Sequence, residues 1–235
     1  MKPYNIYEKY IDDLTLSGLF SGIPRDEIGG LLFCVQARCV NYKKDELIIE
    51  EGASVADFGL MLSGQSRSIK WDLSGKLIII TFIEKGSVIG VMLASKSGHL
   101  SPVSVQATKD SVVMMIPFSR IIARCEKNCQ NHEQLLRNYI GVVAEKGLEL
   151  HERLNCLLEP TMRDKILTYL SKVSREQKRT TFSIPLNRNA MAEYLNIERS
   201  ALSRELSNMK KDGLIDYHKN SFKLESVPIK STTNA

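Results

Sequence analysis

The sequence has no apolar run approaching the roughly 20 residues that a membrane-spanning helix needs. Its first residues, Met1 to Asn5, do not begin the charged-then-apolar pattern of a signal peptide. The proportions of apolar and charged residues are those of an ordinary globular protein. We therefore expect a cytoplasmic protein.

Cysteine is scarce: there are five, an odd number, and no Cys-x-x-Cys occurs, which argues against a disulfide framework. Cys125 and Cys129 are four residues apart and would share one face of a helix. They could form a metal or redox pair, or they could be two small apolar side chains. We favour the second interpretation, because cysteine commonly packs as a small apolar residue.

The motifs of common enzymes are also missing. We find no Walker loop, no nucleophile with a base at catalytic spacing and no metal-ligand motif. The sequence therefore predicts neither an enzyme nor a bound cofactor.

The positive charge of the chain is concentrated at its C-terminal end. Residues 160–235 contain 14 Lys and Arg against 8 Asp and Glu, whereas residues 1–159 contain 18 against 19. All of the excess positive charge thus lies in the last third of the chain, where a polyanion could use it.

Residues 38–118 have the pattern of a β sandwich or barrel, in which short apolar stretches alternate with glycine-containing turns. The predicted strands are Leu47–Ile49, Gly59–Leu62, Ser68–Trp71, Leu77–Ile83, Val88–Leu93, Val103–Ala107 and Val112–Ile116. Before them, Ile6–Leu19 and Arg25–Leu32 are predicted to be helices.

From about Arg120 the apolar period lengthens to three or four residues, which predicts a long helix over residues 130–157. Its apolar seam consists of Leu136, Tyr139, Val143, Leu150 and Leu157. This seam could be a dimer interface or could pack within its own chain, and we favour the dimer interface. Pro160 cannot continue the helix, and Thr161 can cap a new one, so the domain boundary is expected here. The polar residues Ser171–Thr181 are taken as a connection to the next motif.

Residues 186–215 predict a helix-turn-helix. Asn187 can cap a first helix that ends near Leu195, and Asn196 tolerates the left-handed conformation of a tight turn. A second helix is expected from Arg199 to Lys211, ended by Gly213. A hairpin wing around Lys219-Asn220 follows.

The second helix has two faces. Its apolar residues Leu202, Leu206 and Met209 are expected in the core. Its polar face and the wing supply the predicted DNA-binding residues, which are Arg199, Ser200, Ser203, Arg204, Ser207 and Lys219. Arginine can bond two acceptors of guanine, and small hydroxyls permit close approach and phosphate contact.

At this point the sequence resembles the Crp/Fnr family, most closely over Met191–Ile215 and more widely over residues 15–225. The family's recognition arginines fall on Arg199 and Arg204, and its turn glycines on Gly52, Gly64, Gly75, Gly86 and Gly90. The resemblance implies an α+β chain. Its parts would be an effector-sensing jelly roll of cyclic-nucleotide-binding type with N-terminal helices (1–129), a dimerisation helix (130–158) and a winged helix-turn-helix (159–235). The implied partners are a pseudo-palindromic double-stranded DNA operator, a second copy of the chain, RNA polymerase and a small-molecule effector, with no membrane.

The effector positions depart from the family pattern. Cyclic-AMP binders place a Glu where this chain has Val91, and an Arg-Ser pair where it has Ser101-Pro102. Burying a phosphate without its cation and donors is costly, so cyclic AMP is not expected to be the effector. An Fnr-type iron–sulfur cluster needs three thiolates near the N-terminus, and no cysteine precedes Cys34. Haem would need an axial ligand, for which His99, His132 and His151 are weak candidates.

The primary hypothesis is therefore a homodimeric transcription regulator controlled by an unidentified effector. Apolar Met61, Leu93 and Val103 could line an effector pocket or could equally form the barrel core. The alternative is a small-molecule-binding module whose DNA binding is constitutive or degenerate. Activation and repression are both left open.

Overall fold

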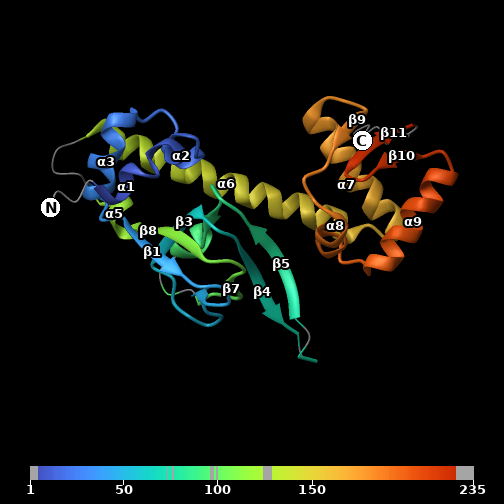
Figure 1. Ribbon diagram of the computed structural model, residues 1–235, viewed down its shortest axis with the longest axis horizontal. Coiled ribbons are helices and arrows are strands. Elements are labelled where there is room, and N and C mark those ends of the chain that lie inside the picture. The colour runs from blue at the N-terminus through green and yellow to red at the C-terminus, as the bar shows by residue number, and fades with distance from the viewer. Residues whose placement is uncertain are drawn as a thin grey trace, which may run out of the picture. The chain divides into compact units, whose positions relative to one another are not determined.

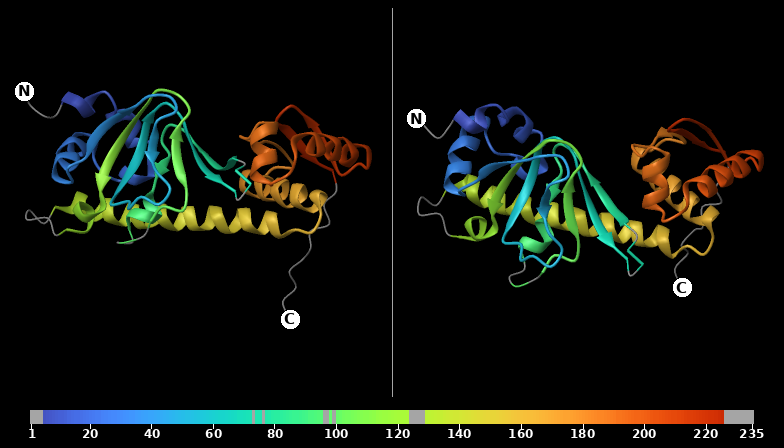
Figure 2. Two further views of the ribbon diagram at one scale, coloured as in Figure 1. Left: turned by 90° about the horizontal axis from the view of Figure 1, so that it is seen from below. Right: turned by 60° about the horizontal axis from the view of Figure 1, so that its bottom comes forward.

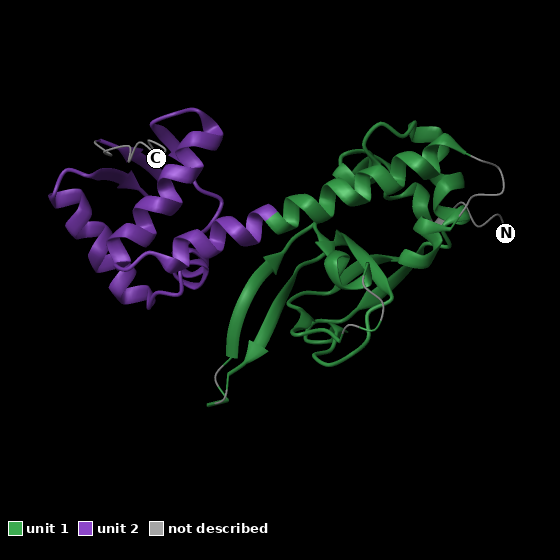
Figure 3. Cartoon of the chain, turned by 180° about the vertical axis from the view of Figure 1, so that it is seen from behind, with its two compact units in different colours: residues 1–147 green, residues 148–235 purple. Residues whose placement is uncertain are grey.

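A computed structural model describes residues 5–72, 74–75, 77–95, 98, 100–123 and 129–225 of the chain (Figure 1). The chain divides into two compact units, Met1–Gly147 and Leu148–Ala235 (Figure 3). None of the helices in the described ranges combines the length and apolar character that a membrane span requires.

The first unit contains the predicted β structure, which is confirmed as two four-stranded sheets that face each other (Figure 2). One sheet has the spatial order β1 (Arg38–Tyr42), β8 (Ser111–Pro117), β3 (Asp57–Ser63) and β6 (Val88–Ile89). The other has the order β2 (Leu47–Ile49), β7 (Ser104–Ala107), β4 (Ser66–Trp71) and β5 (Leu77–Ile83). All of these pairings are antiparallel, as expected for a jelly roll.

The sheet that contains β3 and β8 is buried on both faces. Because side chains alternate along a strand, Phe58 and Leu60 of β3 pack on the helical side, while Met61 points between the sheets. In β8 the same alternation places Met114 with the helices and Val113 between the sheets. The barrel interior is thereby filled with apolar side chains.

The predicted strand Val88–Leu93 is wrong in its second half. Strand β6 ends at Ile89, and a short helix, α4 (Val91–Ala94), follows. Gly90 separates them with φ at 67°, a left-handed conformation that breaks the strand and that glycine adopts without steric cost.

The N-terminal helices are shorter than predicted. They are α1 (Asn5–Glu8), α2 (Ile11–Thr15), the 3₁₀ turn η1 (Gly18–Phe20) and α3 (Arg25–Cys34). A single helix through residue 19 is interrupted because Ser17 is extended and its hydroxyl accepts a hydrogen bond from the Leu19 amide at 3.3 Å. Serine competes with helical hydrogen bonding in this way. The turn buries Leu19 and Phe20 in the core of the first unit.

The predicted long helix is confirmed as α6 (Gln130–Leu158), preceded by the short helix α5 (Phe118–Ile122). Helix α6 begins in the first unit and ends in the second, two residues before Pro160. Thr161 caps α7 (Met162–Gln177), since its hydroxyl accepts a hydrogen bond from the Asp164 amide at 3.1 Å.

Two features of the second unit differ from the prediction. Helix α7 continues through Gln177, because Val173 faces the core, and Lys178 ends it with φ at 50°. The segment that was taken as a connection also contributes β9 (Thr181–Ser183). This strand pairs with β11 (Ser221–Leu224), which pairs in turn with β10 (Ile215–His218). The sheet supports α8 (Arg188–Tyr194) and α9 (Arg199–Lys211).

Candidate DNA-binding surface and dimer helix

The helix-turn-helix forms as predicted. The Asn187 side chain accepts a hydrogen bond from the Ala190 amide at 3.0 Å and so caps α8. Asn196 has φ at 51°, the left-handed conformation expected of the turn. The Ile197 amide then donates to the Ala192 carbonyl at 2.8 Å, which joins the turn back to α8.

Helix α9 is fixed at its buried face and at its C-terminal end. Leu202, Leu206 and Met209 are completely buried. The amide of Leu214 donates to the Met209 carbonyl at 3.0 Å, and Gly213 has φ at 71°. This is a Schellman motif, and glycine adopts the left-handed conformation that the motif requires without steric cost. The orientation of α9 within the second unit is therefore well determined by its sequence.

The opposite face of α9 is exposed and polar. Arg199, Ser200, Ser203, Arg204 and Ser207 are all exposed. The Ser203 hydroxyl donates to the Arg199 carbonyl at 3.1 Å, and the Ser207 hydroxyl donates to the Ser203 carbonyl at 3.0 Å. Within the described part of the chain, neither Arg199 nor Arg204 forms an ion pair, so both guanidinium groups are available to an external acceptor.

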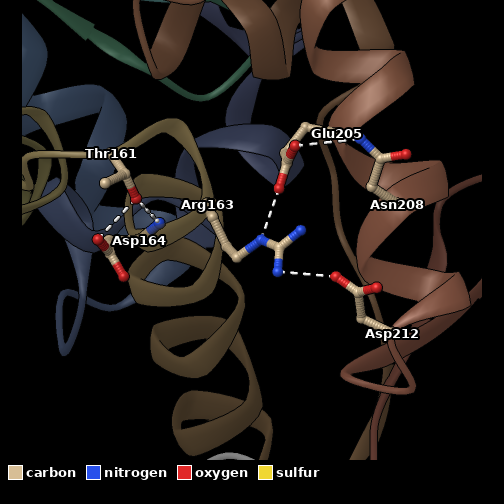
Figure 4. Close-up of polar contacts among 6 residues, drawn as sticks. All are labelled: Thr161, Arg163, Asp164, Glu205, Asn208 and Asp212. Carbon is tan, nitrogen blue, oxygen red and sulfur yellow. Dashed lines mark hydrogen bonds and ion pairs between the residues drawn. The ribbon is translucent and has the colours of Figure 1, made fainter.

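Two acidic side chains, at the far side and the C-terminal end of α9, form ion pairs with Arg163 of α7 (Figure 4). Its Nε lies 2.6 Å from Glu205 Oε1, and its Nη1 lies 2.8 Å from Asp212 Oδ2. The same two carboxylates raise the pKa of Arg163. Arg163 thus ties the first turn of α7 to α9 and offsets part of the negative charge that would otherwise oppose a polyanion.

The wing is held by Arg188, a residue that the sequence analysis did not identify. Its guanidinium group lies 4.9 Å from the ring centroid of Tyr217 and 5.0 Å from that of Phe222. It also donates to the carbonyl of Lys219 at 3.1 Å, and burial lowers its pKa. Lys219 itself is exposed at the tip of the hairpin, with φ at 54°. The alternating sequence of the hairpin predicts a wing, but it does not indicate that Arg188 packs against it.

Glu198 is a second residue that the sequence analysis missed. Its carboxylate caps α9 by accepting a hydrogen bond from the Ala201 amide at 2.8 Å, and it also accepts one from the Ser200 hydroxyl. The Ser200 hydroxyl, the neighbouring amides and the charge of Arg204 lower the pKa of Glu198 to about 2. Ser200 is thus already bonded before any DNA arrives. The one signal in the sequence was an acidic residue at the cap position.

Much of the predicted dimer seam on α6 packs against the core of its own chain. Tyr139 is only 2% exposed, and its ring lies 4.9 Å from that of Phe58. Leu136 and Val143 are partly buried against the same core. We therefore remove Tyr139 from the candidate interface, because its side chain has no surface left for a second copy. Of the other predicted residues, Leu157 is partly buried and Leu150 is 51% exposed.

A different face of α6 is exposed and largely apolar. Large side chains on it are half or more exposed, namely those of Ile140, Leu154 and Leu158. Residues Ile140, Ala144, Gly147, His151, Leu154 and Leu158 follow each other at steps of four and three. This is the spacing of a coiled-coil seam, rotated around the helix from the predicted one.

At the positions where cyclic-AMP binders contact the effector, the side chains of this chain are apolar or already donate a hydrogen bond within the protein. Val91 is buried at the start of α4. Ser101 is buried, and its hydroxyl donates to the Val103 carbonyl at 2.6 Å. Met61 lies in the core between the sheets, whereas Leu93 and Val103 are partly buried.

Among the residues that the structure describes, no three His, Cys, Asp or Glu side chains are grouped so that they could hold a metal ion. His132 is buried, and its Nε2 lies 2.9 Å from the Ile121 carbonyl oxygen, while His151 is exposed. Cys129 is partly buried with a free thiol. Cys125 and His99 lie outside the described residues.

Comparison with known families matches both units. Residues 39–128 match the cyclic nucleotide-binding domain, and residues 164–227 match the Crp-like helix-turn-helix domain. Two curated relatives are each 24% identical to the chain. They are the transcriptional activator protein FnrA of Stutzerimonas stutzeri, with 74% of this chain and 71% of the relative covered, and the transcriptional activator protein Anr of Pseudomonas aeruginosa, with 74% and 70% covered.

Solved structures share the fold. FixK2 from Bradyrhizobium japonicum has a TM-score of 0.54 at 22% identity, covering 81% of this chain and 93% of that one. The c-di-GMP responsive global regulator CLP of Xanthomonas campestris has a TM-score of 0.58 at 14% identity, covering 87% and 100%. The chain belongs to the Crp/Fnr family of DNA-binding transcription regulators.

Proposed function

We propose that the chain is a homodimeric regulator that reads a pseudo-palindromic operator with α9 and contacts the flanking phosphates with its wing. The observation that carries this proposal is the exposed face of α9, where Arg199 and Arg204 have no ion pair among the described residues. In helix-turn-helix proteins the N-terminal residues of the second helix contact base edges. The proposed contacts are Arg199, Ser200, Ser203, Arg204, Ser207 and, from the wing, Lys219.

A second copy of the chain is the proposed partner of α6. The exposed seam from Ile140 to Leu158 would pair with itself as a coiled coil. A symmetric pair would present two copies of α9 to half-sites about 34 Å apart. In this proposal residues 1–129 sense the effector, residues 130–158 form the dimer and residues 159–235 bind DNA.

The proposed effector is a small molecule other than cyclic AMP. Val91, Ser101 and Pro102 offer no cation for a cyclic phosphate, and the Ser101 hydroxyl hydrogen is already donated to the Val103 carbonyl. An effector would act by binding one DNA-competent arrangement of the dimer more tightly than the other. The curated relatives are named transcriptional activators, which supports activation through RNA polymerase.

One observation favours constitutive DNA binding as a second candidate function. Apolar side chains from both sheets, among them Met61, Val105 and Val113, are almost completely buried between the sheets. A barrel filled in this way would bind a ligand only after rearrangement, and DNA binding would then need no effector.

Selection of binding sites from random duplex DNA tests the proposal. The expected result is an inverted repeat whose half-sites are separated by about one helical turn. Repeating the selection with a cell extract of small molecules distinguishes effector control from constitutive binding. Recovery of no sequence preference under either condition would exclude the proposed function.

A further inference from the structure

Glu198 stands at the N-terminal end of α9, which is the end that meets base edges in a helix-turn-helix. Its side chain is exposed rather than folded into the core. Two hydrogen bonds, from the Ser200 hydroxyl and the Ala201 amide, both end on Oε2. These bonds hold the carboxylate in one orientation. An ionised carboxylate has acceptor sites for about four hydrogen bonds, so it can still accept from an external donor.

The charge of this carboxylate is fixed. The pKa of Glu198 is lowered to about 2, chiefly by the Ser200 hydroxyl, so the group does not take up a proton near neutral pH. An ionised carboxylate that enters a groove between phosphates loses its hydration. It needs a hydrogen-bond donor there, because a buried charge without a partner is strongly unfavourable.

The major groove offers such a donor at only some bases. Cytosine presents its N4 amino group and adenine its N6 amino group, whereas guanine and thymine present acceptors. Glutamate characteristically accepts from the cytosine amino group. Ser200 adds to this preference. A hydroxyl has a single hydrogen, and that of Ser200 is already donated to Glu198, so the Ser200 oxygen can only accept a hydrogen bond from a base.

We propose that Glu198, oriented by Ser200, selects a cytosine in each half-site, next to the guanine contacted by Arg204. This inference rests on the proposed DNA-binding function of α9. Ser200 is a positioning residue for Glu198.

The test is selection from random duplex DNA with the full-length protein and two variants. Glu198→Gln has a side chain of the same length but can bond both N6 and N7 of adenine, so the preferred base should change from cytosine to adenine. Glu198→Asp keeps the charge and a good capping oxygen but has a shorter reach, so the cytosine preference should weaken without a change of base. For the wild type, replacing the selected cytosine should weaken binding about 5- to 150-fold, the range of one good base contact.

Glu145→Gln is the matched control, since it removes one exposed negative charge from α6 and none from α9. It should select the same sites as the wild type. Thermal unfolding checks that each variant keeps its helix cap. If Glu198→Gln and Glu198→Asp both select the wild-type sites, Glu198 does not read a base and the inference is wrong. If the wild type itself selects no sequence, it is the proposed function that fails.

Discussion

The Tyr139 hydroxyl donates a hydrogen bond to the Val91 carbonyl at 2.5 Å, and this bond joins the long helix α6 to the short helix α4. The Tyr139 ring packs between Phe58 and Phe118, at centroid distances of 4.9 and 5.1 Å. The position that family members use for effector recognition is thus tied directly to the helix proposed for dimerisation.

Replacing Tyr139 by Phe should lower the free energy of unfolding by about 1 kcal/mol, the net value of one buried hydrogen bond. Burial also raises the pKa of Tyr139 to about 12, above its ordinary value of 10. The neutral phenol is therefore favoured in the folded state, so its contribution is complete below pH 10 and is lost as the pH rises toward 12. Urea unfolding of both proteins at several pH values checks this. The difference between them should shrink above pH 10, and a constant difference would contradict the assignment.

Replacing Arg163 by Met should destabilise the second unit by about 1–2 kcal/mol. Glu205 is only 19% exposed and would lose its cation, although the exposure of Arg163 reduces the effect through solvent screening. A double-mutant cycle with Glu205→Gln isolates the pair, because adding Glu205→Gln should recover part of the loss. Additive effects of the two substitutions would mean that the ion pair contributes nothing measurable.

The helix-turn-helix could be predicted from sequence because its signals are local. Asn187, Asn196 and Gly213 each act on backbone within a few residues, so neither the cap, the turn nor the helix end depends on distant contacts. Strand β9 gave no such signal, because three residues are too few to show alternation.

The face of α6 could not be assigned for a different physical reason. Apolar periodicity indicates which side of a helix is buried, but not whether its own chain or a second copy covers it. The seam that contains Tyr139 and Val143 packs against the first unit. The face that contains Ile140 and Leu154 is interrupted by Gly147 and His151, so its periodicity is weaker in the sequence.

Replacing Ile140 and Leu154 together by Glu should yield monomers, because both side chains are at least half exposed on the proposed coiled-coil seam. Leu150→Glu is the comparison. Leu150 belongs to the predicted seam but lies outside the exposed one, so it should affect the mass much less. Light scattering measures the mass. A dimeric Ile140→Glu, Leu154→Glu protein would place the interface elsewhere, and a monomeric wild type would exclude the paired half-site arrangement.

Cyclic AMP should not bind at micromolar concentration. A cyclic phosphate in this site would lack a cation, and Val91 would leave the ribose hydroxyl without a carboxylate partner. Isothermal titration calorimetry with the purified protein in a nucleotide-free buffer checks this. A tight isotherm of one cyclic AMP per subunit would require a polar site that Val91, Ser101 and Pro102 do not provide.

Replacing Arg204 by Ala should weaken operator binding by about 1–3 kcal/mol and relax the preference for one guanine. The guanidinium group is exposed on α9 and has no ion pair among the described residues, so its loss removes an external contact and not an internal one. Arg175→Ala is the matched control, since Arg175 is an exposed arginine in the last turn of α7 and does not belong to α9. Gel-shift titrations at several salt concentrations separate the two roles of a cation. Loss of a phosphate contact would weaken binding to all sequences and lower the salt dependence by about one ion, whereas loss of a base contact weakens the operator selectively. Unchanged operator affinity in Arg204→Ala would show that α9 does not read the operator through this residue.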